Sequence, residues 1–135
     1  MLGIVVCTHS NFAAGIHAAV EMIAGEQENF DVICFQEGEG MLDLSERVKE
    51  VTSKYEEAGE KYVVCVDLFG ATPFNASAAA LATFDTSVIT GVNLPMLLQL
   101  VMEREFCEDY DEFLASVDEG AKDNIKVIKM REMFS

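Results

Sequence analysis

The 135-residue chain has little proline, with two residues, and few basic side chains, with nine. The basic residues are outnumbered by 24 acidic ones, which gives a formal net charge of −15. A surface this acidic repels nucleic-acid phosphates and anionic lipid, which argues against binding either of them through charge. It favours partners that present a basic face. Because half of the residues are hydrophobic, the composition is that of a globular chain and not of a disordered one.

Cysteine is also scarce, and its spacing excludes the usual metal sites. The four cysteines form no CxxC pair and have no histidine at metal-ligand spacing, so we expect buried thiols in a reducing compartment. No apolar run reaches membrane-spanning length, and Met1 leads into an apolar run without a basic leader. We therefore expect a cytoplasmic protein that does not insert into a membrane. The cysteines are Cys7, Cys34, Cys65 and Cys107.

Short apolar runs alternate with longer segments of helical period. The strand-like runs cover residues 2–7, 31–35, 61–66 and 86–90, and a last candidate covers residues 125–130. The run at 2–7 and the one at 61–66 are continuous and rich in valine and isoleucine, which is typical of parallel strands covered on both faces. The alternation predicts one α/β domain over residues 1–135, an open parallel sheet with helices on both faces.

Helix boundaries are predicted from capping residues. Asp43 is the predicted cap of the second helix, which ends at Gly59. Thr72 precedes Pro73, and the pair predicts a helix with a hydroxyl cap and proline at its first position. Asn93 is expected to begin the next helix in the same way. That helix, at 94–102, is apolar almost all the way round, more than one face of a surface helix needs.

Two chemically active side chains follow the first and third predicted strands. His9 comes at the end of the first strand, and Asp67 comes directly after the third. In a flavodoxin-like sheet of order 2-1-3-4, these two strands are neighbours and flank the crevice where ligands bind. The pattern therefore places His9 and Asp67 together, each beside a helix N-terminus.

The two side chains suit phosphoryl transfer. A carboxylate bound to one ring nitrogen fixes the imidazole tautomer, and the other nitrogen is then free to act as a nucleophile. Hydroxyls and backbone N–H groups at the two helix N-termini supply donors for phosphate oxygens, and no metal is required. The residues predicted to bind the phosphate are Thr8, Ser10, Gly70, Ala71 and Thr72.

The alternative for a single histidine is a packing or capping role, which is the commoner one. The second strand end, with Asp67 before a glycine-containing turn, favours catalysis for His9. His17 has no such support, and we expect it at the partly exposed boundary of the first helix. Residues 37–40 are predicted to form a flexible acidic loop on the crevice side.

At these residues the chain resembles a known family, the enzyme IIA components of the mannose/fructose/sorbose class of the bacterial sugar phosphotransferase system. The matching stretches are residues 5–9, 25–29, 66–67 with 70–75, and 91–97. The last of these reads GVNLPML and is the most specific, because nothing in a generic α/β fold demands it.

The resemblance implies a function. His9 would receive phosphate on the ring nitrogen distal to the backbone, while Asp67 holds the proximal one. The donor would be the histidine-containing phosphocarrier protein, and the acceptor a histidine of the enzyme IIB component, which serves a membrane permease complex. No cofactor is implied. Such proteins are similar in being homodimers that exchange a C-terminal strand, added antiparallel to the sheet edge.

Departures from the family leave other functions open. The family often has glycine where this chain has Ser10, and a hydroxyl residue followed by tryptophan where it has Leu68 and Phe69. The HSN sequence at 9–11 is similar to the phosphodonor subunit of a dihydroxyacetone kinase, a related fold. A non-catalytic flavodoxin-like module that binds an anion or a partner at the same crevice is the third reading. The sequence does not name a sugar.

Overall fold

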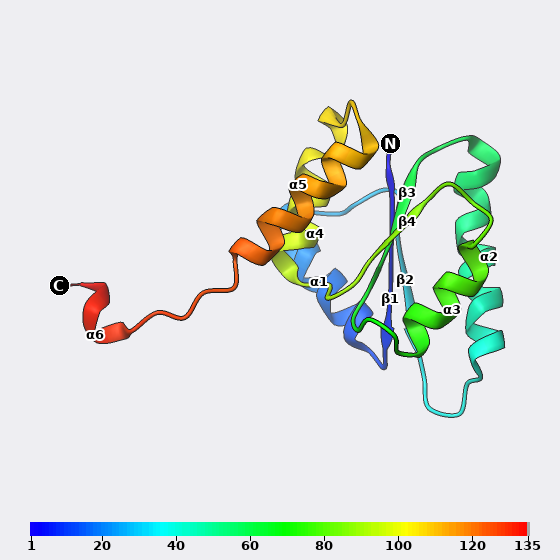
Figure 1. Ribbon diagram of the computed structural model, residues 1–135, viewed down its shortest axis with the longest axis horizontal. Coiled ribbons are helices and arrows are strands. Elements are labelled where there is room, and N and C mark those ends of the chain that lie inside the picture. The colour runs from blue at the N-terminus through cyan, green and yellow to red at the C-terminus, as the bar shows by residue number, and fades with distance from the viewer. Residues whose placement is uncertain (135) are drawn as a thin grey trace.

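The valine- and isoleucine-rich runs form the predicted sheet. The structure, a computed structural model, describes residues 1–134. Within them, four parallel strands pair in the order β2-β1-β3-β4 (Figure 1). This confirms the predicted topology, which puts β1 and β3 side by side at the centre. The strands are β1 (Gly3–His9), β2 (Phe30–Phe35), β3 (Tyr62–Val66) and β4 (Ser87–Ile89).

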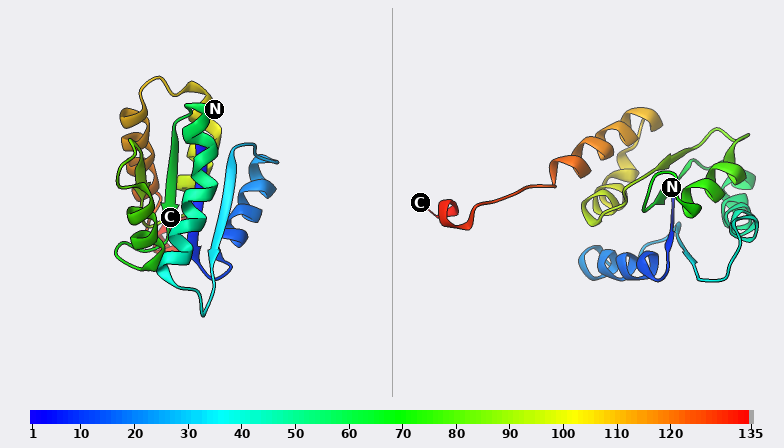
Figure 2. Two further views of the ribbon diagram at one scale, coloured as in Figure 1. Left: turned by 90° about the vertical axis from the view of Figure 1, so that its right-hand side faces the viewer. Right: turned by 60° about the horizontal axis from the view of Figure 1, so that its bottom comes forward.

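Helices cover both faces of the sheet and complete the three-layer α/β/α arrangement. One layer holds α1 (Phe12–Ala24), α4 (Leu94–Glu103) and α5 (Tyr110–Asp123), and the other holds α2 (Met41–Ala58) and α3 (Thr72–Leu81). Figure 2 shows the two layers on opposite sides of the strands. A 3₁₀ turn, η1 (Arg104–Phe106), follows α4, and a short helix, α6 (Met130–Met133), lies near the C-terminus.

The strand β1 is buried on both faces, as a central parallel strand must be. Its Ile4 and Val6 pack under the α1, α4 and α5 layer, whereas Val5 and Cys7 pack under the α2 and α3 layer. Burial raises the pKa of the Cys7 thiol to about 12, and it does the same to Cys65 in β3. All four cysteines are free, which agrees with the predicted buried thiols at these two positions.

The start of α3 differs from the prediction. Thr72 is the first helical residue and Ala71 occupies the cap, so the predicted hydroxyl cap at Thr72 is wrong. The extended backbone of Ala71 leads into the helix without a side-chain bond, and Pro73 sits in the first turn as expected. The prediction for α4 is confirmed, because Oδ1 of Asn93 accepts from the backbone N–H of Met96 at 2.9 Å.

The second helix begins earlier than its predicted cap. Gly40 is the cap residue of α2, and Asp43 lies within the first turn, so its predicted capping role is wrong. A carboxylate in the first turn still interacts favourably with the helix dipole. The predicted end is confirmed, since Gly59 has φ 68° and its N–H bonds back to the last turn.

The C-terminal segment forms no strand in this chain. Residues 125–129 have no regular structure and lead into α6, so the predicted strand at 125–130 is wrong for the single chain. The segment leaves the body at the end of α5 and projects away from it (Figure 1). An edge strand forms only where a neighbouring strand offers N–H and C=O groups to pair with, and this segment reaches none here.

The side chain of Arg104 ties the amino-terminal edge of the sheet together. It is 4% exposed, and Nη1 donates to the carbonyl of Leu2 at 2.9 Å and to that of Asn29 at 3.1 Å. Nη2 donates to the carbonyl of Glu28 at 2.6 Å and to Oε1 of Gln27 at 3.2 Å. One guanidinium thereby donates hydrogen bonds to acceptors in the turn before β2 and to the carbonyl just before β1. Burial lowers its pKa.

Replacement of Arg104 by methionine is therefore expected to be costly. It keeps much of the side-chain volume but removes the guanidinium donor from the carbonyls of Leu2, Glu28 and Asn29, of which that of Asn29 still accepts from the backbone N–H of Ile4. We expect the free energy of unfolding, measured by urea titration, to fall by about 3 kcal/mol. Lys122→Met removes an exposed cation from α5 and is the control, with an expected midpoint close to that of the parent chain. Equal midpoints for the two variants would contradict the role given to Arg104.

Candidate functional site at the carboxyl ends of β1 and β3

The structure brings His9 and Asp67 into direct contact. His9 is the last residue of β1, and Asp67 follows the last residue of β3. The two strands are paired, with Cys7 opposite Val66, so both side chains leave the same edge of the sheet. Nδ1 of His9 lies 2.7 Å from Oδ2 of Asp67, and the backbone N–H of His9 donates to the same oxygen at 3.0 Å. The predicted pairing across the crevice is thus present.

The carboxylate of Asp67 is held in its ionised form. Burial alone would raise its pKa, but the hydrogen bonds from the backbone and the ring of His9 outweigh burial and leave the pKa below the usual value. Its other oxygen, Oδ1, accepts from the backbone N–H of Leu68 at 3.0 Å. An ionised carboxylate can only accept, so Nδ1 of His9 carries the proton. In the neutral imidazole the lone pair is then on Nε2.

A hollow beside His9 opens toward β2. It has a volume of about 570 Å³ and is lined by His9, Ser10, Phe35, Gln36 and Glu37. The imidazole is 43% exposed, and its ring meets that of Phe35 edge-on at 6.0 Å between centroids. Phe35 and Gln36 were not predicted as site residues. Their place at the end of β2, next to β1 in the sheet, is the signal that could have found them.

Thr8 has a structural task instead of the predicted phosphate contact. Its side chain is fully buried, and Oγ1 accepts from the backbone N–H of Ala13 at 2.7 Å. The hydroxyl also donates to the carbonyl of His9 at 3.2 Å. Both interactions fix the passage from β1 into α1, so the hydroxyl is not available to a ligand.

Ser10 adopts a left-handed backbone conformation at the turn out of β1. Its φ is 51°, a region that glycine enters without cost and other residues rarely use. The backbone N–H of Ser10 donates to the carbonyl of Phe35 at 2.7 Å, which holds the turn against β2. This conformation gives a physical reason for glycine at the equivalent place of the resembling family.

The chain passes from Asp67 into α3 through Gly70 and Ala71. Gly70 has φ 80°, and its carbonyl accepts from the amide of Asn75 at 3.1 Å. Ala71 and Thr72 follow at the N-terminus of α3, on the same edge of the sheet as His9. They do not line the hollow beside His9, which opens on the β2 side of the imidazole.

The loop from β2 to α2 is anchored, in contrast to the predicted flexible loop at 37–40. The carboxylate of Glu39 accepts from the backbone N–H of Gln36 at 2.8 Å and from Nη1 of Arg47 at 2.8 Å. The bond from the Gln36 backbone and the guanidinium of Arg47 lower the pKa of Glu39. Arg47 also donates to the carbonyl of Cys34 at 3.1 Å, which fastens the loop to β2. Glu37 is thereby kept at the wall of the hollow.

Exposed apolar side chains surround the site. Leu68 is 60% exposed and Phe69 77% exposed, directly after Asp67. The ring of Phe69 packs against Phe74 of α3 with centroids 4.9 Å apart. Phe12, at the start of α1, is 48% exposed. Large apolar side chains around a polar centre are typical of a protein-binding surface.

The second histidine lies outside this site, as predicted. His17 stacks on Phe30 with ring centroids 4.8 Å apart, and its Nε2 is 3.5 Å from a carboxylate oxygen of Glu21. Its side chain is 28% exposed, which confirms a boundary position on α1. Phe30 begins β2, so His17 sits toward the edge of the sheet opposite His9.

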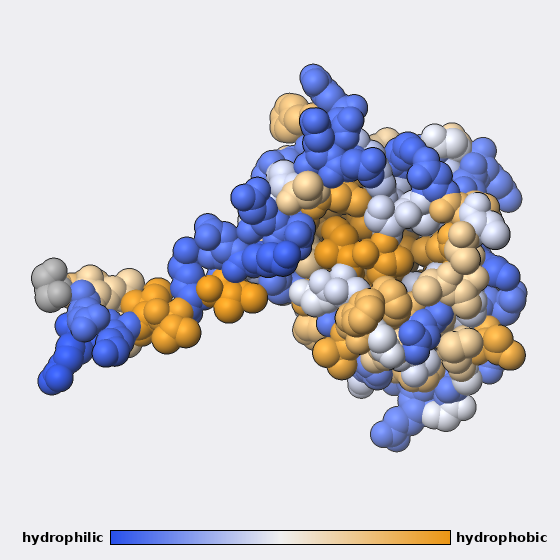
Figure 3. Space-filling view, viewed as in Figure 1, coloured by the Kyte–Doolittle hydropathy of each residue, from blue (hydrophilic) through white to orange (hydrophobic). Residues whose placement is uncertain are grey.

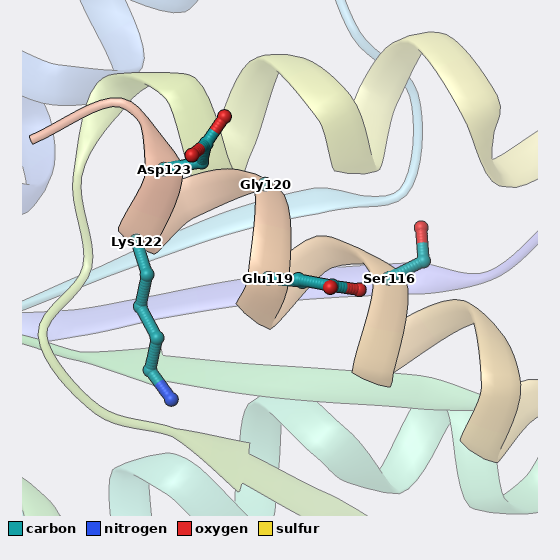
Figure 4. A pocket seen from close by; sticks show the side chains of 5 residues that line it. All are labelled: Ser116, Glu119, Gly120, Lys122 and Asp123. Carbon is teal, nitrogen blue, oxygen red and sulfur yellow. The ribbon is translucent and has the colours of Figure 1, made fainter.

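Another hollow, of about 640 Å³, runs along the last turns of α5. Figure 4 shows its side chains, with Lys122, Glu119 and Asp123 pointing in different directions. They converge on no common point, and the hollow contains no histidine or cysteine. It offers no arrangement comparable to His9 and Asp67.

No group of three or more histidine, cysteine, aspartate or glutamate side chains within residues 1–134 is placed to hold a metal ion.

The described residues also contain no helix long and apolar enough to cross a membrane.

Known proteins share the sequence and the fold. The profile of a family described as PTS system fructose IIA component (EIIA-man) matches residues 3–118. The mannose-specific EIIAB component of Escherichia coli K12 is 32% identical over 131 residues, which cover 96% of this chain and 40% of that protein. The fructose-specific EIIA component of Bacillus subtilis is 33% identical over 106 residues, 78% of this chain and 72% of that one. The chain therefore spans about 40% of the length of the mannose relative.

Solved structures agree. The crystal structure of phosphotransferase system component EIIA from Streptococcus agalactiae superposes with a TM-score of 0.86 at 30% identity, covering 94% of this chain and 97% of that one. The mannose/sorbose-specific IIA subunit from Enterococcus faecalis gives 0.82 at 23% identity, covering 98% of both chains, which shows the common fold. With a profile match over most of its length and relatives above 30% identity, the chain belongs to the EIIA family of the mannose/fructose/sorbose phosphotransferase systems.

Proposed function

We propose that this chain carries a phosphoryl group on Nε2 of His9, which it accepts from one protein and passes to another. The contact between Nδ1 of His9 and the carboxylate of Asp67 at 2.7 Å is the observation that supports this most strongly. It leaves the free lone pair on Nε2 of a ring that is 43% exposed beside a hollow. Membership in the EIIA family gives the reaction its class.

The bonds made and broken in the transfer involve His9 and the two partner proteins. The Nε2 lone pair attacks phosphorus, a new N–P bond forms, and the bond from phosphorus to the donor's nitrogen breaks with its electrons returning to the donor ring. The imidazole of His9 becomes positively charged, and the ionised carboxylate of Asp67 stabilises that charge. Delivery to the acceptor reverses these steps with a second imidazole as the nucleophile.

Backbone groups at two helix starts are proposed to receive the phosphoryl oxygens. The candidates are the N–H groups of Gly70, Ala71 and Thr72 at the start of α3, with the hydroxyls of Thr72 and Ser10. The positive end of each helix dipole favours the anion there. The hydroxyl of Thr8 is left out, because it is buried and already bonded.

The proposed donor is the histidine-containing phosphocarrier protein, and the proposed acceptor is an enzyme IIB component with its membrane permease complex. A net charge of −15 favours a donor with a basic face. This chain matches 40% of the length of the mannose-specific EIIAB component, whose name combines a IIA and a IIB part. These partners would place the chain in the cytoplasm.

A homodimer with exchanged C-terminal strands belongs to the same proposal. The strand β4 lies at the edge of the sheet, with one side unpaired. Figure 3 shows apolar side chains gathered over this region of the molecule, between α5 and α3. The segment that could pair with it leaves the body, with Ile125 77% exposed and Val127 fully exposed. A segment from a second copy would cover the open edge.

Removal of the His9 imidazole is expected to abolish phosphorylation. The chain is incubated with phosphoenolpyruvate, the general phosphotransferase enzyme and the phosphocarrier protein, and its intact mass is recorded. The parent chain should gain one acid-labile, alkali-stable phosphate, and His9→Ala should gain none. His17→Ala, which removes a histidine outside the site, should label like the parent.

Two results would overturn the proposal: labelling of His9→Ala at the parent level, or no covalent phosphate on the parent chain. The second would favour a non-catalytic module that binds an anion or a partner reversibly. Acceptors are then compared by mixing the phosphorylated chain with a IIB component or with a dihydroxyacetone kinase. Transfer to the kinase alone would replace the proposed acceptor.

The Asp67→Asn variant is expected to lose rate but to stay folded. An amide has no negative charge to stabilise the imidazolium, so transfer from the phosphocarrier should slow by about hundredfold or more. The lowered pKa of Asp67 means that its carboxylate adds stability above its unfolded-state pKa and loses it as the pH falls. The variant should therefore show less loss of stability on acidification than the parent. Asp85→Asn, at a carboxylate that is 99% exposed, is the control and should keep the parent rate.

Light scattering at micromolar concentration tests the oligomeric state. We expect the mass of a dimer for the full chain and that of a monomer for a chain ending at Asn124, which lacks the exchanged segment. A monomeric full chain would contradict the dimer while leaving the role of His9 intact.

A further inference from the structure

The last residues differ in charge and exposure from the rest of the chain. We refer to residues 125–134 as the C-terminal arm. It holds three of the nine basic residues, Lys126, Lys129 and Arg131, although the whole chain has a net charge of −15. It also exposes large apolar side chains, with Met130 at 65%, Met133 at 53% and Phe134 at 87%. A cationic segment with uncovered apolar side chains is suited to an acidic, partly apolar groove.

Such a groove lies between α2 and α3, on the face of the molecule opposite α5. It has a volume of about 580 Å³. Ala79, Ala80 and Phe84, at the end of α3, give it an apolar wall, and Phe84 is 44% exposed. Two carboxylates of α2, Glu56 and Glu57, line the opposite wall together with one cation of the same helix, Lys49, so this wall has an excess of negative charge. The groove lies near the end of α3 and the start of β4. It is therefore at the amino ends of the strands, away from His9.

The arm of the same chain does not lie near this groove. It leaves from the end of α5, in the other helix layer, and extends away from the body in Figure 1 and in the right-hand view of Figure 2. The arm of a second copy approaches differently. The strand β4 runs toward the end of the sheet where His9 lies. An exchanged strand antiparallel to β4 therefore starts at the His9 end of the sheet and finishes at the end where the strands begin.

The lengths agree with this path. Five extended residues, 125–129, span about 17 Å, the same as residues 86–90 that contain β4. If these two stretches face each other, Met130 comes level with Asp85, one residue before the start of that stretch. The short helix α6 then begins beside Phe84, at the mouth of the α2–α3 groove.

We propose that α6 of one copy docks into the α2–α3 groove of the second copy and locks the exchanged strand in place. Met130, Met133 and Phe134 cover the apolar wall, and Lys129 and Arg131 approach the carboxylates of the acidic wall. The inference rests on the dimer of the proposed function and adds an interaction surface to it. The positive charge of the arm offsets part of the electrostatic repulsion between two acidic chains.

Disulfide trapping tests the docking. A Phe84→Cys chain is mixed with a Met130→Cys chain, allowed to exchange and mildly oxidised. Tethering raises the local concentration of the two thiols, so the cross-linked heterodimer should form in about tenfold higher yield than in controls. The controls are the parent chain or Ala18→Cys, on the exposed face of α1, each mixed with Met130→Cys.

Truncation gives a second measurement. A chain ending at Lys129 keeps the strand and loses α6, and its dimer dissociation constant should rise by about tenfold or more. We expect full phosphorylation of His9 in this variant, because the groove lies at the amino ends of the strands and His9 at their carboxyl ends. The phosphorylation assay thus tests the role of His9, and the dimer dissociation constant tests the docking of α6 separately.

Three outcomes would overturn the docking. Trapping at the control level in a chain that is still a dimer would place α6 elsewhere. A parent chain that is monomeric in solution would mean that no second copy is present to receive α6. A Phe84→Cys, Met130→Cys double variant that closes within one monomer would show that the arm folds onto its own groove.

Discussion

The short contact between the His9 imidazole and the Asp67 carboxylate is the interaction on which the site depends. It exists because β1 and β3, separated by β2 and α2 in the sequence, are neighbours in the sheet and end at the same edge. The carboxylate binds both the ring and the backbone of His9, so it fixes the side chain and the strand end at once. One charged group thereby sets the tautomer and the orientation of the imidazole.

The carboxyl and amino ends of the strands differ in the groups that they position. At the carboxyl edge, turns with left-handed backbone at Ser10 and Gly70 bring helix N-termini close to His9. At the amino edge, the buried guanidinium of Arg104 satisfies the carbonyls before β1 and β2. Residues 25–29, one of the stretches that resembles the EIIA family, lie at this second edge. Three of them, Gln27, Glu28 and Asn29, accept hydrogen bonds from Arg104, and none of the five lines the hollow beside His9.

Sequence patterns were reliable where a local rule and the fold agreed. The apolar runs predicted four parallel strands, and the order 2-1-3-4, expected from a flavodoxin-like sheet, is confirmed. The strand ends predicted that His9 and Asp67 would meet. Asn93 caps α4 as expected from its short side chain before proline. Predictions failed where a single residue was interpreted without its surroundings. The sequence predicts Asp43 as a cap, but Gly40, with an extended backbone, is the cap residue, three positions earlier.

The sequence by itself determined the fold class, the topology and the pair at the centre of the site, because hydrophobic period and strand-end position are local properties. Only the tertiary structure decided which hydroxyls remain free. Thr8 points into the core and bonds to α1, while Ser10 turns out toward the hollow. The structure also decided that residues 125–130 form no strand in one chain, since a strand requires a partner that the sequence does not locate. The contact of His9 with Phe35 likewise depends on the lateral pairing of β1 with β2.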